Sequence, residues 1–375
     1  MADKPAAAAT SHSGVTPAGT IPEGGQSRAK MGAVKMDDIA RMAGVSKSTV
    51  SRALSGSPLV NEETRARIQA LVNSHSYRVD TRAQGLRKGH THTIAVVIPL
   101  LHEHDQPISD PFFLELLGHI ADAVADHGYD LLLSKIGPGR ASGMADLVDT
   151  GRVDGLIAIG QSTAHLGLER LADRNLPLVV WGAQLPEQHY VTVGSDNKAG
   201  AERAVAHLIA QGRRRIVFLG QRTVPEMRLR HDGYVAALAA AGIEPDPALD
   251  VPTRFASAAA LTAMRSLICG GATFDAVFAC SDVIAISAIR ALQDQGLKVP
   301  EDVAVVGYDD VQMAAFYNPA LTTVRQDTAT GGRLLVDLLF AQIAGRPTRS
   351  VMLPTELVVR ASSGVVSGTT TPGAR

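Results

Sequence analysis

The spacing of apolar residues in the first part of the chain predicts a polar extension followed by three short helices. Residues 1–32 are rich in Ala, Gly, Ser, Thr and Pro, and we expect them to be disordered because they offer little apolar surface to bury. Beyond them, apolar residues recur at helical intervals, and glycine or proline residues interrupt the pattern. The three helices are predicted at Met36–Ala43, Lys47–Leu54 and Glu62–Ser74.

After Gly89 the pattern changes to short apolar runs that alternate with amphipathic helices. The strands are predicted at Thr93–Pro99, Asp130–Ser134, Gly155–Ile159, Leu178–Trp181, Tyr190–Gly194, Arg215–Gly220, Ala276–Ala279 and Val303–Gly307. The helices between them are predicted at Phe112–His127, Lys198–Gln211, Asp232–Ala241, Ser257–Cys269 and Val283–Gln295. This alternation is typical of an α/β fold with doubly wound parallel sheets, and there are enough strands for two sheets.

Length and composition indicate a soluble protein of more than one domain. The chain has 375 residues, which exceeds the usual size of one compact core. No apolar run approaches the roughly 20 residues that span a membrane, and no secretory signal is recognisable, so we expect a cytoplasmic protein. The two cysteines, Cys269 and Cys280, are expected to be buried free thiols. Met31 and Met36 are alternatives to Met1 as the start of translation.

The charge is unevenly distributed along the chain. The whole chain carries a net charge of −1, yet residues 33–90 contain ten basic and five acidic side chains. The remainder, from Thr91 onward, contains 23 basic and 30 acidic side chains. A small basic head on an acidic body indicates a polyanionic partner that only the head contacts.

The first two predicted helices have the spacing of a helix-turn-helix. Ala40 is small where the helices cross, Gly44 permits the turn, and Val50 fills the space between the helices. The second helix then exposes short hydroxyl donors and two cations, which suit phosphate and base contacts. These candidate DNA-binding residues are Lys47, Ser48, Thr49, Ser51 and Arg52. The alternative is a three-helix cap on an enzyme with an ordinary charged surface.

The sequence resembles the LacI/GalR family of bacterial regulators from about Val34 to Ser363. The resemblance is carried by Asp38-Ile-Ala, Ala43-Gly-Val-Ser, Thr49-Val-Ser-Arg, Asn61-Glu-Glu-Thr-Arg and Tyr77-Arg. It implies that Lys47, Ser48 and Arg52 read bases, whereas Thr49 and Ser51 contact phosphate. It also implies a helix-turn-helix head joined to a periplasmic-binding-protein-like sensor that has two doubly wound subdomains.

The resemblance also implies how the chain divides into domains. The expected parts are an extension (1–32), a head (33–78), a linker (79–90), a sensor (91–363) and a disordered tail (364–375). Within the sensor, the first subdomain is expected at about 91–195 and 326–350, and the second at about 196–325 and 351–363.

The linker corresponds to the family's hinge helix, which folds when a dimer sits on its operator. Leu86 matches the leucine that enters the minor groove, and Ala83 and Gln84 lie beside it. Val79 and Asp80 replace the Pro and Asn that usually precede this helix. A plain flexible linker is therefore the alternative.

Several residues of the sensor match effector-binding positions of the family, at the carboxyl ends of strands. They are Phe113, Arg230, Phe255, Ser281 and Asp309. In addition, we expect a sugar to stack on the ring of Trp181. Carboxylate, guanidinium and aromatic groups together suit a polyhydroxylated ligand. The alternatives are that Phe112 or Phe113 belongs to the core, that Asp282 caps a helix, and that Asp310 supports a turn.

The segment Leu101–Ile108 is longer than the corresponding loop of the family and contains two histidines, His102 and His104. With Glu103 and Asp105 they suggest a metal site, but no other ligand cluster accompanies them. We therefore expect a solvated charged loop beside the effector site, and neither a metal nor a cofactor.

These features together predict a homodimeric repressor of carbohydrate uptake or catabolism genes that binds a pseudo-palindromic operator. A small sugar is expected to release it, and a ligand that acts as corepressor is the alternative. A solute-binding protein for sugar transport fits the body but leaves the head unexplained. An enzyme of sugar or nucleotide metabolism is disfavoured because the dinucleotide-binding, phosphate-loop and nucleophile motifs are missing.

Overall fold

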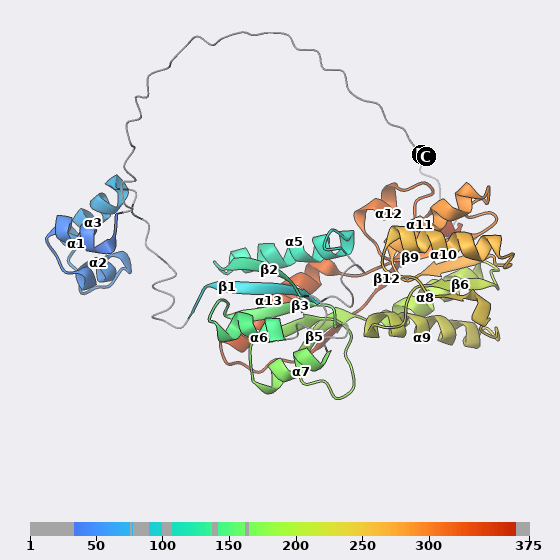
Figure 1. Cartoon of the computed structure of the whole chain (residues 1–375), viewed down its shortest axis with the longest axis horizontal. Coiled ribbons are helices and arrows are strands. Elements are labelled where there is room, and N and C mark those ends of the chain that lie inside the picture. The colour runs from blue at the N-terminus through green and yellow to red at the C-terminus, as the bar shows by residue number, and fades with distance from the viewer. Residues whose placement is uncertain are drawn as a thin grey trace, which may run out of the picture. The chain divides into compact units, whose positions relative to one another are not determined.

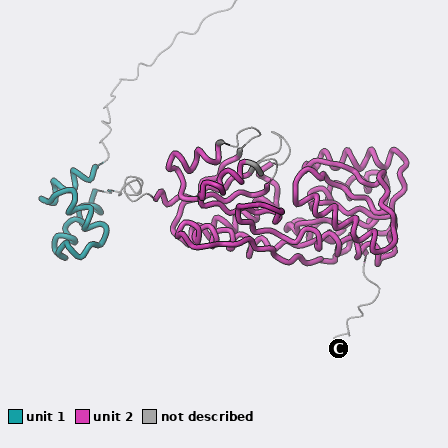
Figure 2. Tube along the Cα trace, turned by 90° about the horizontal axis from the view of Figure 1, so that it is seen from below, with its two compact units in different colours: residues 1–81 teal, residues 82–375 magenta. Residues whose placement is uncertain are grey.

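The computed structural model describes residues 34–75, 77, 90–99, 107–136, 142–161 and 165–364. The chain divides into two compact units, residues 1–81 and 82–375 (Figure 2). In the described residues, no helix is both long enough and apolar enough to cross a bilayer.

In its described residues, the first unit contains three helices: α1 (Met36–Ala43), α2 (Lys47–Leu54) and α3 (Glu62–Ser74). Their bounds are those predicted from the sequence. Ile39, Val50 and Ile68, one from each helix, are fully buried and form the centre of a small core. Since each helix is too short to be stable alone, this shared core holds the three together.

The turn between α1 and α2 depends on a left-handed residue and a cap. Gly44 has φ 66° and ends α1, and a side chain would be strained in this conformation. The hydroxyl of Ser46 accepts a hydrogen bond from the Thr49 backbone N–H at 3.2 Å and so begins α2. This turn therefore fixes the direction in which α2 leaves α1.

The second unit contains two six-stranded sheets, each covered by helices on both faces (Figure 1). The first sheet is entirely parallel, with strand order β11-β5-β4-β3-β1-β2. Its strands are β1 (Thr93–Pro99), β2 (Asp130–Ile136), β3 (Gly155–Ile159), β4 (Leu178–Trp181), β5 (Val191–Ser195) and β11 (Val351–Leu353).

Two separate apolar cores cover the faces of this sheet. The helices α5 (Pro111–Asp126) and α13 (Thr328–Ile343) pack on one face, where Leu116 and Leu335 are fully buried. The helices α6 (Ser142–Asp149) and α7 (His165–Asp173) pack on the other face, where Met144 and Leu168 are buried. Burial on both faces explains why the strands read as continuous apolar runs.

The second sheet has the order β12-β10-β9-β8-β6-β7 and is parallel except for the antiparallel edge pair β10–β12. Its strands are β6 (Ile216–Leu219), β7 (Asp250–Val251), β8 (Ala276–Ala279), β9 (Ala304–Asp309), β10 (Thr322–Arg325) and β12 (Glu356–Val358). Its helices are α8 (Asn197–Ala210), α9 (Pro225–Ala240), α10 (Ser257–Cys269), α11 (Asp282–Asp294) and α12 (Gln312–Phe316). Two short 3₁₀ turns, Pro247–Leu249 and Ala361–Ser363, complete this part.

The chain passes between the two subdomains after β5, after β10 and after β11. The third crossing follows Leu353, because Val351–Leu353 pairs with β5 in the first sheet. The prediction that residues 351–353 belong to the second subdomain was therefore wrong. A three-residue strand has too short a pattern to reveal which sheet it joins.

Candidate functional site

The second helix of the head presents the candidate DNA-binding residues. Lys47, Ser48 and Arg52 are exposed, whereas Thr49 and Ser51 are half-buried beside the buried Val50 and Ala53. Lys47 Nζ pairs with Asp37 at 3.0 Å, and the Ser48 hydroxyl lies 2.8 Å from that of Ser46. Arg52 forms no ion pair with any described residue. Of the two cations on this helix, Arg52 is thus the one without an ion pair among the described residues.

The candidate hinge residues Ala83, Gln84 and Leu86 lie outside the described residues, as do His102 and His104 of the lengthened loop. Their roles stay predictions.

In the sensor, Arg230 is the centre of a buried polar cluster. Its Nε donates to Asn197 Oδ1 at 2.8 Å, and its Nη1 donates to the Cys280 carbonyl at 2.5 Å. The same Nη1 lies 3.5 Å from Asp309 Oδ1, and the guanidinium carbon is 3.6 Å from the centre of the Tyr308 ring. Contacts on several sides hold the guanidinium in one orientation while its charge faces Asp309.

Asp309 ends β9 in an unusual backbone conformation, with φ 121°. Its carboxylate accepts a hydrogen bond from Gln326 Nε2 at 2.8 Å. Burial raises the pKa of Asp309 to about 7, the charge of Arg230 opposes this rise, and the negative charge of Asp110 adds to it. The interaction with Asp110 is notable because Asp110 caps α5 of the first subdomain. The structure therefore places Asp110 of the first subdomain close enough to act on the charge of Asp309 in the second.

Glu226 is a member of this cluster that the sequence analysis missed. It lies one helical turn before Arg230 on α9, and burial raises the pKa of its carboxyl group. The charge of Arg230 lowers this pKa, and so does a hydrogen bond from the backbone N–H of Gln161 in the first subdomain. The spacing of Glu226 and Arg230 by four residues is the signal that was available, since such residues share one face of a helix.

Ser281 and Asp282 have structural partners. Ser281 is buried and caps α11 by accepting from the Ile284 N–H at 3.4 Å. Asp282 is fully buried and accepts from the Val311 N–H at 2.9 Å and from Thr323 Oγ1 at 2.5 Å. Burial first, and the charge of Asp309 second, raise the pKa of Asp282 well above its ordinary value. Asp282 thus holds the turn that follows Asp309, the last residue of β9.

The aromatic side chains that were predicted to contact the effector are largely buried, and little of each ring is exposed for stacking on a ligand. Trp181 is 5% exposed, and its ring lies 6.0 Å from that of Phe112. A Cβ atom at Gly331 of α13 would be only 2.3 Å from the Trp181 ring, so α13 packs directly on it. Phe255 is 9% exposed within the core of the second sheet, and Phe113 is half-buried. Trp181 has a packing role in the core, and its role as a sugar platform stays a prediction.

One group of potential metal ligands comes together among the described residues. Glu169 and Asp173 lie one turn apart on α7, and His189 Nδ1 lies 3.0 Å from a Glu169 oxygen and 3.7 Å from an Asp173 oxygen. These are side-chain contacts at the surface, and no second observation points to a bound ion.

Comparison with known proteins gives consistent results over both units. Residues 35–80 match the bacterial regulatory proteins of the lacI family, and residues 205–363 match the periplasmic binding protein-like domain. The HTH-type transcriptional repressor CytR of Escherichia coli (strain K12) is 33% identical over 337 residues. These cover 88% of this chain and 96% of the relative.

Two solved structures match this chain over nearly the whole of their own length. The complex of the transcriptional regulator CelR with cellobiose is 31% identical, with a TM-score of 0.67, over 88% of this chain and 99% of that chain. The lac repressor dimer bound to operator and the anti-inducer ONPF is 26% identical, with a TM-score of 0.77, over the same shares. The two-sheet architecture and the attached head therefore occur together in both.

Proposed function

Because the chain belongs to the LacI family of bacterial regulatory proteins, we propose that it represses genes of carbohydrate uptake or catabolism and leaves its operator when a small sugar binds. The family and these relatives are transcription regulators, so the chain is a regulator and not an enzyme. A protein that acts on operator DNA works in the cytoplasm, where bacterial DNA is.

The buried Arg230–Asp309 pair is the observation that supports a sugar as effector. A carboxylate and a guanidinium at 3.5 Å present fixed acceptors and donors to adjacent hydroxyl groups of one ligand. The carboxyl groups of Asp110 and Glu226 lie near this pair, on two different elements. A relative of similar architecture, CelR, is known as a complex with cellobiose.

For the head, we propose that α2 enters the major groove of DNA. Lys47, Ser48 and Arg52 are exposed and would meet base edges, whereas Thr49 and Ser51, closer to the core, would meet phosphate. In this proposal Leu86 of each linker enters the minor groove, with Ala83 and Gln84 beside it.

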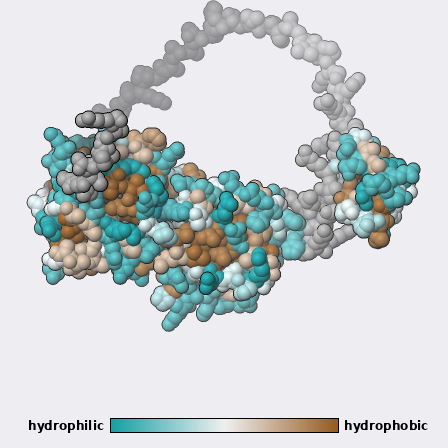
Figure 3. All heavy atoms as spheres, turned by 180° about the vertical axis from the view of Figure 1, so that it is seen from behind, coloured by the Kyte–Doolittle hydropathy of each residue, from teal (hydrophilic) through white to brown (hydrophobic). Residues whose placement is uncertain are grey.

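A dimer is proposed from the exposed apolar residues of the sensor. Leu114 of α5 is 49% exposed, and Met313 and Phe316 of α12 are 57% and 78% exposed. Figure 1 shows α5 and α12 along the same edge of the sensor, the upper edge in that view. Figure 3, from behind, shows apolar areas on both lobes. Exposed apolar area of this kind marks contact surfaces, and a two-fold dimer would place two heads on a pseudo-palindromic operator.

The switch requires that the sugar prefer one orientation of the two subdomains. Asp110 and Gln161 come from the first subdomain, and Arg230, Glu226 and Asp309 from the second. A ligand that bonds to both sets favours the orientation in which they are close. The sugar can weaken DNA binding by no more than the ratio of its affinities for the two orientations, the one it favours and the one that binds DNA.

The test is fluorescence anisotropy with DNA selected from a random pool, at fixed salt, with and without a panel of sugars. One sugar is expected to weaken binding at least about tenfold, which corresponds to about 1.4 kcal/mol of coupling. A sugar that strengthens binding would instead identify a corepressor. If no specific sequence is selected, the head is not a DNA reader and the proposal fails.

The same assay separates base reading from general charge. Arg52→Ala is expected to lose discrimination between the selected sequence and a changed one, by about 1–3 kcal/mol. The matched control is Arg67→Ala, which removes the same charge from the exposed side of α3. Equal losses of discrimination in both variants would show that α2 does not read bases.

A further inference from the structure

Two of the three chain crossings of the sensor are joined by hydrogen bonds to the Arg230–Asp309 site. Arg230 Nε donates to Asn197 Oδ1 at 2.8 Å. Asn197 Nδ2 in turn donates at 3.0 Å to the carbonyl of Ser195, the last residue before the first crossing. Asp309 accepts from Gln326, which follows β10 at the start of the second crossing. A displacement of either member of the pair therefore acts on a crossing.

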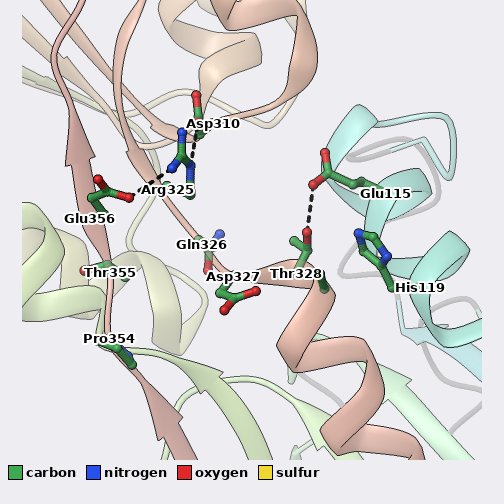
Figure 4. Close-up of a pocket in the computed structure, with 11 residues that line it drawn as sticks. Glu115, His119, Asp310, Arg325, Gln326, Asp327, Thr328, Pro354, Thr355 and Glu356 are labelled. Atoms are coloured by element: carbon green, nitrogen blue, oxygen red, sulfur yellow. Dashed lines mark hydrogen bonds and ion pairs between the residues drawn. The ribbon is translucent and has the colours of Figure 1, made fainter. Parts of the chain in front are cut away.

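Tyr308 extends from the same site to the third crossing. The guanidinium carbon of Arg230 lies 3.6 Å from the centre of its ring. At the other end of the ring, its hydroxyl oxygen lies against Gly200 of α8. A Cβ atom at Gly200 would be 2.6 Å from this oxygen and 2.9 Å from Thr355 Oγ1. Thr355 belongs to the third crossing, and Figure 4 labels it together with Gln326 of the second.

The hydroxyl of Tyr308 is fully buried and has no hydrogen-bond partner among the described residues. Burial raises the pKa of Tyr308, so the hydroxyl is protonated and is a donor without an acceptor. The hydroxyl of Ser195, before the first crossing, is also buried and unpaired within the part of the chain that the structure describes. Unpaired buried groups cost free energy, so an orientation of the subdomains that gave these hydroxyls partners would be favoured by them.

Thr355 Oγ1 is the acceptor nearest at hand for Tyr308. Both oxygens face the open side of Gly200, where no side chain separates them. In this structure Thr355 Oγ1 accepts from Arg203 Nη2 instead. The crossings are the segments that must move when the subdomains change orientation, whereas Tyr308 is fixed in the centre of the second sheet. A change of orientation therefore alters the distance between the two oxygens.

We propose that Tyr308 is a positioning residue that couples the effector site to the crossings, and that its hydroxyl bonds to Thr355 in a second orientation of the two subdomains. The bond is broken in the orientation of this structure, in which Asp110 of the first subdomain approaches Asp309 of the second. It therefore opposes the orientation that a ligand shared by both subdomains favours. The link to a sugar rests on the function proposed above, whereas the bond and the two orientations do not.

The experiment measures the distance between two spin labels, one on each subdomain, by electron–electron double resonance. Cys269 carries one label, since it is exposed at the end of α10, contrary to the prediction that both cysteines are buried. Arg152→Cys, in the exposed loop after α6, carries the other, and the buried Cys280 stays unlabelled. The full chain is used without sugar or operator. It is diluted with unlabelled chain, so that only distances within one chain are measured.

Two distances are expected for the original chain, one for each orientation. Tyr308→Phe is expected to raise the population that matches this structure about fivefold relative to the other, because it removes a bond made only in the other. The matched control is Tyr234→Phe, which removes the hydroxyl of another buried ring of the second subdomain. That hydroxyl donates to the Ile216 carbonyl at 2.9 Å, so its loss lowers stability and should leave the ratio of the two populations unchanged.

The acceptor is identified by repeating the substitution in Thr355→Val, where Tyr308→Phe should no longer change the ratio because the bond is already absent. An undiminished effect in that background overturns the bond to Thr355. The proposal as a whole is overturned by the same ratio in Tyr308→Phe and the original chain, by a shift toward the other distance, or by equal shifts in Tyr308→Phe and Tyr234→Phe. Circular dichroism verifies that every variant is folded.

A second measurement connects the crossings to the effector. Tyr308→Phe is expected to bind the sugar that the operator assay identifies up to about fivefold more tightly, because the orientation that the sugar favours is then more populated. A hydroxyl that only supported Arg230 would give the opposite sign. If the distance ratio changes and the sugar affinity does not, the bond at the third crossing stands and the proposed effector site fails.

Discussion

At the residue scale, Asp309 combines three properties that a ligand-binding carboxylate needs. It is buried, it is held by Gln326, and it faces Arg230 at 3.5 Å. Its φ of 121° is a conformation that side chains rarely adopt, so the surrounding structure must hold it there. A residue so constrained has little conformational freedom to lose when a ligand binds.

We expect Asp309→Asn to weaken sugar binding by about 1.5–3 kcal/mol, because hydrogen bonds to a charged acceptor become bonds to a neutral one. The amide has the same size, and its oxygen can still accept from Gln326. Calorimetric titration of the sugar that the operator assay identifies measures the change. Asp337→Asn, on the exposed side of α13, is the control and is expected to have no effect. Unchanged affinity in the Asp309 variant would remove this residue from the site.

The raised pKa of Asp309 gives a pH dependence with a definite sign. The ionised carboxylate is the form that accepts hydroxyl donors, so sugar affinity is expected to rise as pH increases through about 7 and then to level off. About one unit below the pKa, roughly a tenth of the carboxylate is ionised, and affinity is expected to be about tenfold below its plateau.

Two variants check the origin of this dependence. In Asp309→Asn the profile should become flat. In Asp110→Asn the midpoint should move to lower pH, because the negative charge of Asp110 contributes to raising the pKa of Asp309. A midpoint that does not move would show that another group titrates.

At the element scale, the helix-turn-helix depends on local caps. Ser46 begins α2, and its hydroxyl accepts from the Thr49 N–H. This bond satisfies a donor that no residue inside the helix can satisfy, and an N-cap of this kind contributes about 1 kcal/mol. The head has a small core, so each cap is a large share of its stability.

We expect Ser46→Ala to lower the free energy of local opening of the head by about 1 kcal/mol. Hydrogen exchange of peptides from α1 and α2 in the full chain measures this quantity. Ser74→Ala, at the end of α3, removes a hydroxyl that bonds to the Leu71 carbonyl, and it is the control with an effect of at most about 0.5 kcal/mol. Equal exchange in the Ser46 variant and the original chain would contradict the capping role.

At the scale of the whole molecule, the proposed dimer can be tested by a substitution in its interface. Phe316→Asp replaces an exposed aromatic ring by a charge at the proposed interface and is expected to yield monomers in light scattering. Its affinity for a palindromic operator should fall toward that for a half-site, because the second head is no longer linked to the first.

The control for this prediction is Met352→Asp, which places a charge at another exposed apolar residue of the sensor. That variant should keep the mass of the original chain. If Phe316→Asp also keeps it, then α12 is not part of the interface.

The sequence alone determined what is encoded locally. The three helices of the head have the predicted bounds because Gly44 and the caps at Ser46 and Asn61 act within a few residues. The longer strands and the helix Ser257–Cys269 were predicted because the spacing of their apolar residues is visible in the sequence. The family itself followed from dense motifs in the head.

Only the tertiary structure decided what depends on distant segments. The strands β7, β10, β11 and β12 were not predicted, because they have two to four residues and form by pairing with strands far along the chain. The neighbourhood of Asp110, Glu226 and Asp309 arises where two sheets meet, and no spacing in the sequence expresses it. The hydrogen bond between Thr328 and Glu115 has the same origin, since it joins residues 213 positions apart. A local pattern fixes an element, whereas a site shared by two subdomains exists only once their packing is fixed.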